Sequence, residues 1–334
     1  MNKSKSDFLN FVLLSLFLIF NSPPSPGQSV KDFQPSGKPV FLNFSNVHYS
    51  FNKTGGTPAF EITRLYLGYE YSFSKSFSAR AVLDIGDPGI GGLQMTAYVK
   101  NALLMYKTAD FSARFGMIGT DAFGLIEKQW NHRYILKPLQ DEYGLNPSAD
   151  LGVSIEYSPS RLISFDVSVL NGEGYKKVQA DSVFKYTAGI SFRPADGFLL
   201  RAYTDFMKKD VLQNTLSFFT GYSKGNLNLG VEYALQRNNK MIRDRDFSGI
   251  SVTGAVKISE RFGLFARYDY LHSVTIGNDI NPWNFNNDGQ LIIAGAEYSP
   301  VAGIRIAPVY FGRIPANPGK PFTSSPGIYF EIKL

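Results

Sequence analysis

Four arginines close similar four-residue stretches, which read FSAR, FSAR, FLLR and LFAR. They are Arg80, Arg114, Arg201 and Arg267. Asp84, Asp205 and Asp269 follow three of these arginines after two to four residues. A guanidinium group binds phosphate-like anions through two parallel hydrogen bonds, and it pairs with carboxylates in the same way. The pattern therefore predicts either a ring of anion-binding arginines or a wall of arginine–carboxylate pairs, and we favour the pairs.

Residues suited to hydrolysis or metal binding are few and scattered. The absence of Cys excludes disulfides, a thiol nucleophile and Cys-based metal sites. His48, His132 and His272 have no metal-ligand spacing, and we read His132 as a polar loop residue. A G-x-S-x-G match surrounds Ser223, but a nucleophile elbow needs a strand-to-helix turn and this match falls in a predicted hairpin turn. We expect no enzymatic activity, no metal and no cofactor.

Composition points away from a cytosolic protein. The 334 residues include 28 Phe and 19 Tyr but only 19% charged residues, whereas charged residues usually make up about a quarter of a soluble protein. The net charge of +6 is not gathered into one basic block. Nucleic acid is therefore not an expected partner.

The amino terminus has the features of an export signal. Lys3 and Lys5 precede the apolar run Phe8–Phe20, whose 13 residues are fewer than the roughly 20 that a spanning helix needs but suit a signal peptide. A buried core helix is the alternative, which the proline-rich stretch at 23–26 disfavours. Small residues before Gln28 suit cleavage. We predict a signal peptide over 1–27, a periplasmic lead-in over 28–39 and a β-barrel over 40–334.

Beyond the signal, apolar and polar residues alternate with the period of a β-strand. In Phe77–Ile85, for example, every second side chain is apolar, a spacing that would scatter these side chains around a helix. The alternation is least clean in the first, fourth, tenth and fifteenth segments, and Pro308 lies in the fifteenth. The sixteen predicted strands are 40–51, 60–73, 77–85, 94–107, 111–118, 149–157, 162–171, 185–192, 198–206, 214–222, 227–236, 247–258, 262–271, 290–298, 304–311 and 327–334.

Connections between these strands alternate between short and long. The longer ones are 52–59, 86–93, 119–148, 172–184, 207–213, 237–246, 272–289 and 312–326. Short periplasmic turns and long outer loops on an even number of strands are typical of bacterial outer-membrane barrels. Aromatic residues gather near the short turns, as in an interfacial girdle. We predict a transmembrane, antiparallel, up-and-down β-barrel of about sixteen strands, a size that leaves an aqueous channel. A soluble all-β protein is the alternative.

The third outer loop, 119–148, is thirty residues long and unusually apolar for a free loop. We expect it to fold into the barrel and narrow the channel, although it could instead pack on neighbouring loops or on a second subunit. The residues proposed for this constriction are Lys128, Trp130, Arg133, Tyr134 and Lys137.

Three stretches resemble a known family of membrane channels. They read FEITRLYLGYEYSFSKSFSARAVLDIG (60–86), LIEKQWNHRYILKPLQDEYGLNPSADLGVSIEY (125–157) and VSVLNGEGYKK (167–177). They are similar to porins of Bacteroidota outer membranes, grouped with the phosphate-selective porin O and P family. The resemblance implies a sixteen-stranded, trimeric porin that is either general or anion-preferring, and it does not establish phosphate as the solute.

Strand parity divides the charges evenly inside the predicted channel. Ten basic residues face the lumen: Arg64, Arg80, Lys100, Arg114, Lys185, Arg201, Lys257, Arg267, Arg305 and Lys333. Ten acidic residues do so too: Glu70, Asp84, Asp150, Glu156, Asp166, Asp205, Glu232, Asp269, Glu297 and Glu331. Selectivity then depends on the arrangement of charges, because charges beyond about 10 Å are screened.

The outer mouth is more basic. Loops 172–184, 207–213, 237–246 and 312–326 carry ten Lys and Arg against five Asp and Glu. Such a mouth could attract small anions, acidic lipopolysaccharide or a neighbouring protein. We predict an outer-membrane porin for small hydrophilic solutes or ions, surrounded by lipid and lipopolysaccharide; the alternative is a non-conducting barrel that acts as an adhesin or assembly partner.

Overall fold

The computed structural model describes residues 33–86 and 95–334. The chain divides into a short amino-terminal segment, Met1–Gln34, and a barrel unit, Pro35–Leu334. The predicted signal peptide lies outside the described residues, and so does nearly all of the predicted loop 86–93. Among the residues described, no helix has the length and apolarity to cross a membrane.

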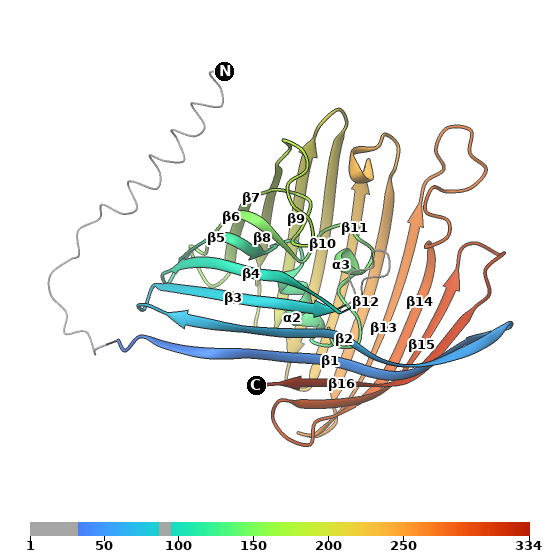
Figure 1. Ribbon diagram of the computed structural model, residues 1–334, viewed down its shortest axis with the longest axis horizontal. Coiled ribbons are helices and arrows are strands. Elements are labelled where there is room, and N and C mark those ends of the chain that lie inside the picture. The colour runs from blue at the N-terminus through green and yellow to red at the C-terminus, as the bar shows by residue number, and fades with distance from the viewer. Residues whose placement is uncertain (1–32, 87–94) are drawn as a thin grey trace. The chain divides into compact units, whose positions relative to one another are not determined.

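Sixteen antiparallel strands close into one barrel, as predicted (Figure 1). Each strand pairs with its neighbours in sequence, and β16 pairs with β1, where Lys333 lies opposite Leu42. The strands are β1 (Ser36–Asn52), β2 (Gly55–Ser72), β3 (Phe77–Gly86), β4 (Thr96–Lys107), β5 (Phe111–Gly119), β6 (Ala149–Tyr157), β7 (Ile163–Leu170), β8 (Lys185–Phe192), β9 (Phe198–Lys208), β10 (Leu212–Lys224), β11 (Leu227–Arg237), β12 (Phe247–Lys257), β13 (Phe262–Ser273), β14 (Gly289–Tyr298), β15 (Ile304–Pro315) and β16 (Thr323–Lys333).

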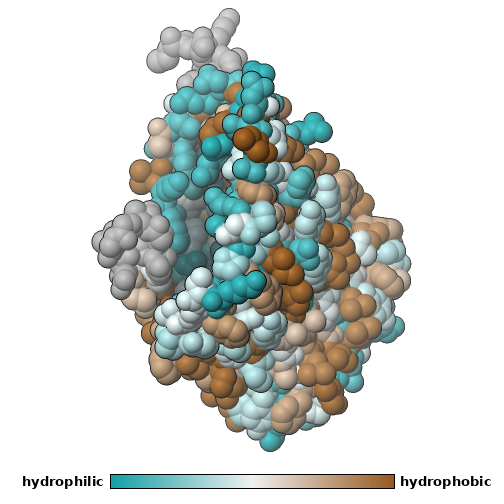
Figure 2. All heavy atoms as spheres, turned by 90° about the vertical axis from the view of Figure 1, so that its right-hand side faces the viewer, coloured by the Kyte–Doolittle hydropathy of each residue, from teal (hydrophilic) through white to brown (hydrophobic). Residues whose placement is uncertain are grey.

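The wall has an apolar outer face and a largely polar inner face. On β13, Leu264, Tyr268 and Tyr270 are exposed on the outside, whereas Arg267 and Asp269 are buried inside. Apolar side chains cover much of the wall in Figure 2. Closure of the sheet pairs the backbone groups of every strand along both edges, which a β structure in lipid requires.

Aromatic side chains lie beside the short turns, as predicted, and several of them pair. The ring centroids of Tyr71 and Phe73 are 5.0 Å apart, and those of Phe262 and Tyr298 are 4.7 Å apart. This end of the barrel therefore has the aromatic belt expected at a membrane interface.

The first predicted outer loop, 52–59, is wrong. β1 and β2 run on to a two-residue turn at 53–54, with Asn52 opposite Gly55. The Asn52 side chain accepts a hydrogen bond from the Thr54 backbone N–H at 2.8 Å, and Gly55 takes a positive φ of 147°, which glycine adopts readily. β1 also begins at Ser36 rather than at residue 40. The strict alternation of short and long connections therefore fails at its first step.

Irregular pairing explains two of the strands that alternate poorly, the fourth and the fifteenth. The pairing register shifts at Lys100 of β4 and at Thr63 of β2, which each lie opposite no residue of the neighbouring strand. Each shift adds one residue to one strand and so reverses the facing of the side chains beyond it. On β15, pairing with β14 is interrupted between Ile306 and Val309, at Pro308, which has no N–H to donate.

Candidate functional site

The segment between β5 and β6 folds into the barrel and packs on the inner wall. It contains two short helices, α2 (Gly124–Trp130) and α3 (Leu139–Glu142), which lie within the ring of strands (Figure 1). We call residues 120–148 the inner loop. Its apolar side chains, unusual for a loop in water, are buried against the wall.

Three apolar clusters attach the inner loop to different parts of the wall. Trp130, Tyr134 and Ile135 pack against residues of β1–β3 and β13–β16. Phe123 and Ile126 pack against β9 and β10, and Leu139 and Leu145 pack against β11–β13. The loop is thus held around much of the circumference.

Hydrogen bonds reinforce these attachments. Tyr134 Oη donates to Glu297 Oε2 on β14 at 2.8 Å, and Gln129 Nε2 donates to Asn228 Oδ1 on β11 at 2.7 Å. Arg267 donates to the Lys137 carbonyl at 2.6 Å. Side chains from well-separated strands therefore fix the path of the loop.

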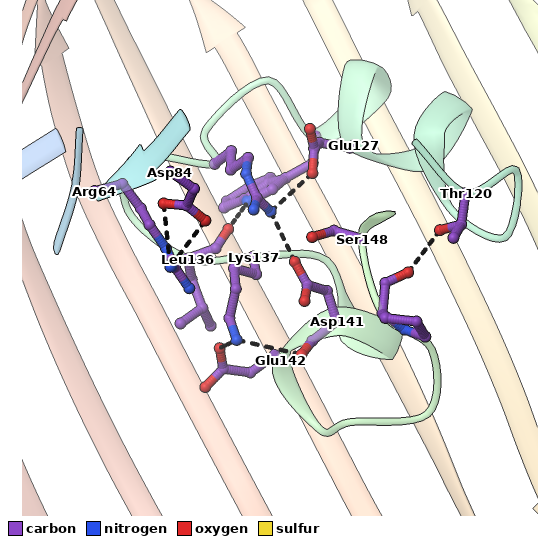
Figure 3. A network of polar contacts seen from close by, with 12 residues as sticks. Arg64, Asp84, Thr120, Glu127, Leu136, Lys137, Asp141, Glu142 and Ser148 are labelled. Carbon is purple, nitrogen blue, oxygen red and sulfur yellow. Dashed lines mark hydrogen bonds and ion pairs between the residues drawn. The ribbon is translucent and has the colours of Figure 1, made fainter. Parts of the chain in front are cut away.

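Arg133 is the centre of a polar network within the inner loop, and Figure 3 labels two of its partners, Glu127 and Asp141. Its Nη1 donates to Glu127 Oε2 at 2.8 Å and to Asp141 Oδ2 at 3.0 Å. Burial alone would lower the pKa of Arg133, but Tyr66 and the two carboxylates raise it well above its usual value. Burial would raise the pKa of Asp141, but Arg133 lowers it. Both groups therefore stay charged at neutral pH.

The other proposed constriction residues occupy different environments. Trp130 is buried and its indole N–H donates to the Leu136 carbonyl at 2.9 Å. Lys137 Nζ lies 3.5 Å from Glu142 Oε2, whereas Lys128 is exposed and has no ion pair in the described part of the chain.

His132, expected to be a polar loop residue, is buried and packs on Phe265 with 4.4 Å between the centroids of the tilted rings. Its Nδ1 donates to the Trp130 carbonyl at 2.8 Å. Burial lowers its pKa, although Glu297 opposes this shift. Within residues 33–86 and 95–334, no cluster of His, Asp and Glu could hold a metal.

All four arginines of the repeated stretches are paired with carboxylates. The shortest distances between guanidinium nitrogen and carboxylate oxygen are 3.0 Å for Arg80–Glu70, 2.5 Å for Arg114–Asp121, 2.7 Å for Arg201–Asp166 and 2.7 Å for Arg267–Asp269. Only one of the four partners, Asp269, is an acid that the sequence places beside its arginine. The arrangement is a wall of ion pairs and not a ring of free guanidinium groups.

The remaining predicted acids have other partners. Asp84 on β3 pairs across the sheet with Arg64 on β2 at 3.1 Å. Asp205 on β9 accepts hydrogen bonds from Asn146 of the inner loop and from Tyr203. Strand neighbours and the loop, rather than spacing along one strand, decide these contacts.

A cavity of about 440 Å³ lies between the inner loop and one side of the wall. Its basic lining residues are Arg80, Lys100, Arg114, Lys128, Arg133 and Arg201. Its acidic ones are Asp121, Glu127, Glu156 and Asp166. Val40, Leu42 and Leu125 add apolar surface.

Two solved structures with a similar fold are membrane channels. The outer membrane channel DcaP of Acinetobacter baumannii is 14% identical over 93% of this chain and 100% of its own, with a TM-score of 0.63. An anion-selective porin from Comamonas acidovorans is 9% identical over 90% and 100%, with a TM-score of 0.62. The fold is a porin-type barrel.

A trimer form of OmpT, an outer membrane protein of Vibrio cholerae, is also similar. It is 14% identical over 90% of this chain and 100% of its own, with a TM-score of 0.56. No family model and no curated protein matches the chain. At these identities the likeness concerns the fold of the barrel.

A second segment, predicted to be an ordinary outer loop, also enters the barrel. Tyr175, between β7 and β8, donates to Asp84 Oδ2 at 2.5 Å, and its ring lies 4.2 Å from Lys100 Nζ. Lys100 also contacts Ser148 Oγ of the inner loop. Burial, and then Asp84, raise the pKa of Tyr175. The tyrosine inside the motif NGEGYKK was the available signal for this contact.

Replacing Tyr175 with Phe should loosen this segment while the barrel stays folded. The change removes the donor to buried Asp84, and such a loss costs about 1–3 kcal/mol. We expect faster amide hydrogen exchange over 172–182, measured by mass spectrometry on folded protein. Tyr222→Phe is the matched control, since Tyr222 packs on Phe198 at the turn end. Unchanged exchange in Tyr175→Phe would contradict the anchoring role.

Proposed function

We propose that this protein is an outer-membrane porin that allows passive diffusion of small hydrophilic solutes or ions. The observation that carries the proposal is the 440 Å³ cavity left between the inner loop and the wall of a sixteen-stranded barrel. The inner loop narrows the channel, because it occupies lumen that sixteen strands would otherwise leave open to water. The solved channels with this fold support the proposal.

The charges around the cavity favour weak selection of anions. Arg114, Arg133 and Arg201 pair with acids that also line the cavity, and Arg80 pairs with Glu70. In the described part of the chain, Lys100, Lys128 and Glu156 are the lining charges with no ion pair. Two lysines against one glutamate leave a small positive excess where a solute would pass whenever both lysines are protonated. We therefore assign anion preference to Lys100 and Lys128 rather than to the arginines.

The same proposal implies the membrane contacts, the export and the oligomeric state of the protein. The apolar outer face would contact outer-membrane lipid, and the loop end would contact lipopolysaccharide. A signal peptide over 1–27 would direct export. The trimer form of the similar OmpT barrel supports a homotrimer.

Single-channel recording in planar bilayers tests this function. We expect discrete conductance steps and a reversal potential in a KCl gradient that indicates modest chloride preference. Phosphate replacing chloride should also permeate, because the excess charge is not specific for one anion. Cation preference would contradict the role given to the two lysines, and the absence of any steps from correctly folded protein would contradict the porin function.

The alternatives predict different outcomes. A non-conducting adhesin or assembly partner would insert into bilayers without solute uptake. An enzyme would need a nucleophile, but Ser223 lies at the end of β10, two residues before a turn glycine, Gly225, with a φ of 60°. Hydrolase activity that is lost in Ser223→Ala would overturn the non-enzymatic assignment.

A further inference from the structure

Basic side chains gather over the loop end of four neighbouring strands. We call this group, Lys208, Lys209, Arg237, Lys240 and Arg243, the β9–β12 rim. All five residues are exposed. Among residues 33–86 and 95–334, none of the five has an acidic partner within 4.0 Å, although Asp210 and Asp244 are close in sequence. The rim therefore presents positive charge that the protein itself does not neutralise.

Lys208 and Arg237 face away from the channel. Lys208 continues the outer face of β9 after exposed Phe206, while Met207 is buried inside. Arg237 continues the outer face of β11 after Tyr233 and Leu235, while Gln236 is buried inside. β10 lies between the two strands, so the two side chains start roughly 10 Å apart across the sheet. Positive side chains on the outer face at the loop end contact the molecules around the barrel, rather than a solute at the channel entrance.

Elsewhere on the outer face, charge is scarce and paired. Among the described strands, the other outward-facing Lys or Arg is Lys224, which lies at the turn end and pairs with Asp196 at 3.2 Å. Just below the rim the wall is apolar and aromatic: Tyr186 and Phe206 stack with 5.6 Å between ring centroids, and Leu212 is 47% exposed. A ligand with both an acidic head and apolar chains fits this surface.

The loop that carries Lys240 and Arg243 is held in an unusual conformation. Asn238, Lys240, Met241 and Asp244 all have positive φ, between 52° and 62°. Such residues cost free energy and occur where a site is held in place. The loop includes η1 (Asn239–Met241), and it is fixed to β10 by hydrogen bonds from Asn238 Nδ2 to the Leu212 carbonyl at 2.7 Å and from the Lys240 N–H to Gln213 at 2.6 Å. These bonds keep the basic side chains close to the β9–β10 connection.

We propose that the β9–β12 rim binds the phosphate groups of an acylated glycolipid of the lipid A type in the surrounding leaflet. The phosphates would lie against Lys208, Arg237 and the 238–246 loop, and the acyl chains would follow the apolar wall below. The inference rests on the proposed location in the outer membrane, with the loop end outward. It does not depend on conduction through the channel.

Native mass spectrometry of the folded barrel in detergent tests this site with diphosphoryl lipid A as the probe. The variant is Lys208→Gln with Arg237→Gln. Each basic residue near an anionic lipid surface contributes about 1 kcal/mol, so we expect roughly 30-fold weaker binding in the double variant. Should that variant not fold, Lys240→Gln with Arg243→Gln, which changes only exposed loop residues, should also weaken binding.

Lys224→Gln is the matched control, because Lys224 faces outward at the opposite end of the barrel and should leave lipid A binding unchanged. Dephosphorylated lipid A should bind weakly, and inorganic phosphate should not displace the intact lipid. Equal binding by the double variant or by dephosphorylated lipid A, or displacement of the intact lipid by excess inorganic phosphate, would overturn the proposal. Bilayer conductance of the same preparations reports separately on the porin function, and the rim variants should conduct normally.

Discussion

Deleting Phe123–Glu142 and bridging the gap with a short Gly-Ser linker should raise the single-channel conductance several-fold. These residues include α2, α3 and the Arg133 network, and they occupy the lumen at the level of the cavity. Without them, the wall encloses the wide aqueous channel that sixteen strands permit. Conductance in planar bilayers, at one salt concentration for both proteins, measures the effect.

Two further variants make this result decisive. Deleting Gly277–Ile280, the exposed tip of another long loop, should leave conductance unchanged. If the large deletion does not fold, Trp130→Ala with Tyr134→Ala should still increase conductance or its fluctuations, because it removes two buried side chains that hold the inner loop. Wild-type conductance in all of these folded variants would show that the inner loop does not limit the channel.

Replacing Lys100 and Lys128 together with Glu should change the channel from anion-preferring to cation-preferring. The lining charges without an ion pair would change from two lysines and one glutamate to three glutamates. Fixed charges in a narrow, poorly screened pore determine which ions enter it. Reversal potentials in a KCl gradient measure the change. Because Lys100 contacts Ser148 and Tyr175, the single Lys128→Glu variant, exposed at the cavity, should show a smaller shift in the same direction.

In contrast to the lysine variants, Arg267→Gln should affect the stability of the barrel rather than its ion selectivity. Arg267 forms two hydrogen bonds to Asp269, at 2.8 and 2.7 Å, and both residues are buried away from the 440 Å³ cavity. Leaving a buried acid unpaired costs about 3–5 kcal/mol. We therefore expect a lower unfolding temperature with little change in the reversal potential. A large loss of anion preference in this variant would show that the repeated arginines, and not the two lysines, determine the selectivity of the channel.

The architecture could be predicted because it depends on local pattern. Alternation along Phe77–Ile85 and its counterparts places one face of each strand toward an apolar environment. Summed over sixteen segments, that pattern leaves a closed barrel as the arrangement that satisfies every backbone group in lipid. The alternation predicted the strands least well at two kinds of place. One is where an extra residue shifts the pairing register, as at Lys100. The other is where a paired hairpin is longer than predicted, as at Asn52.

The partners of the charged residues required the tertiary structure. Arg80 stands four residues from Asp84, yet it pairs with Glu70, while Asp84 pairs with Arg64 and Tyr175. Side chains across a ladder are about 5 Å apart, closer than residues four apart along one extended strand. Pairing register, rather than spacing in the sequence, therefore selects each partner.

The sequence by itself determined the barrel, the count of strands and the apolar character of the connection 119–148. Only the tertiary structure decided which charges remain unpaired beside the cavity, that Tyr175 enters the lumen, and that the basic rim faces outward. The physical reason is range: hydrophobic alternation acts within one strand, whereas ion pairing and loop packing join residues that only closure of the barrel brings together.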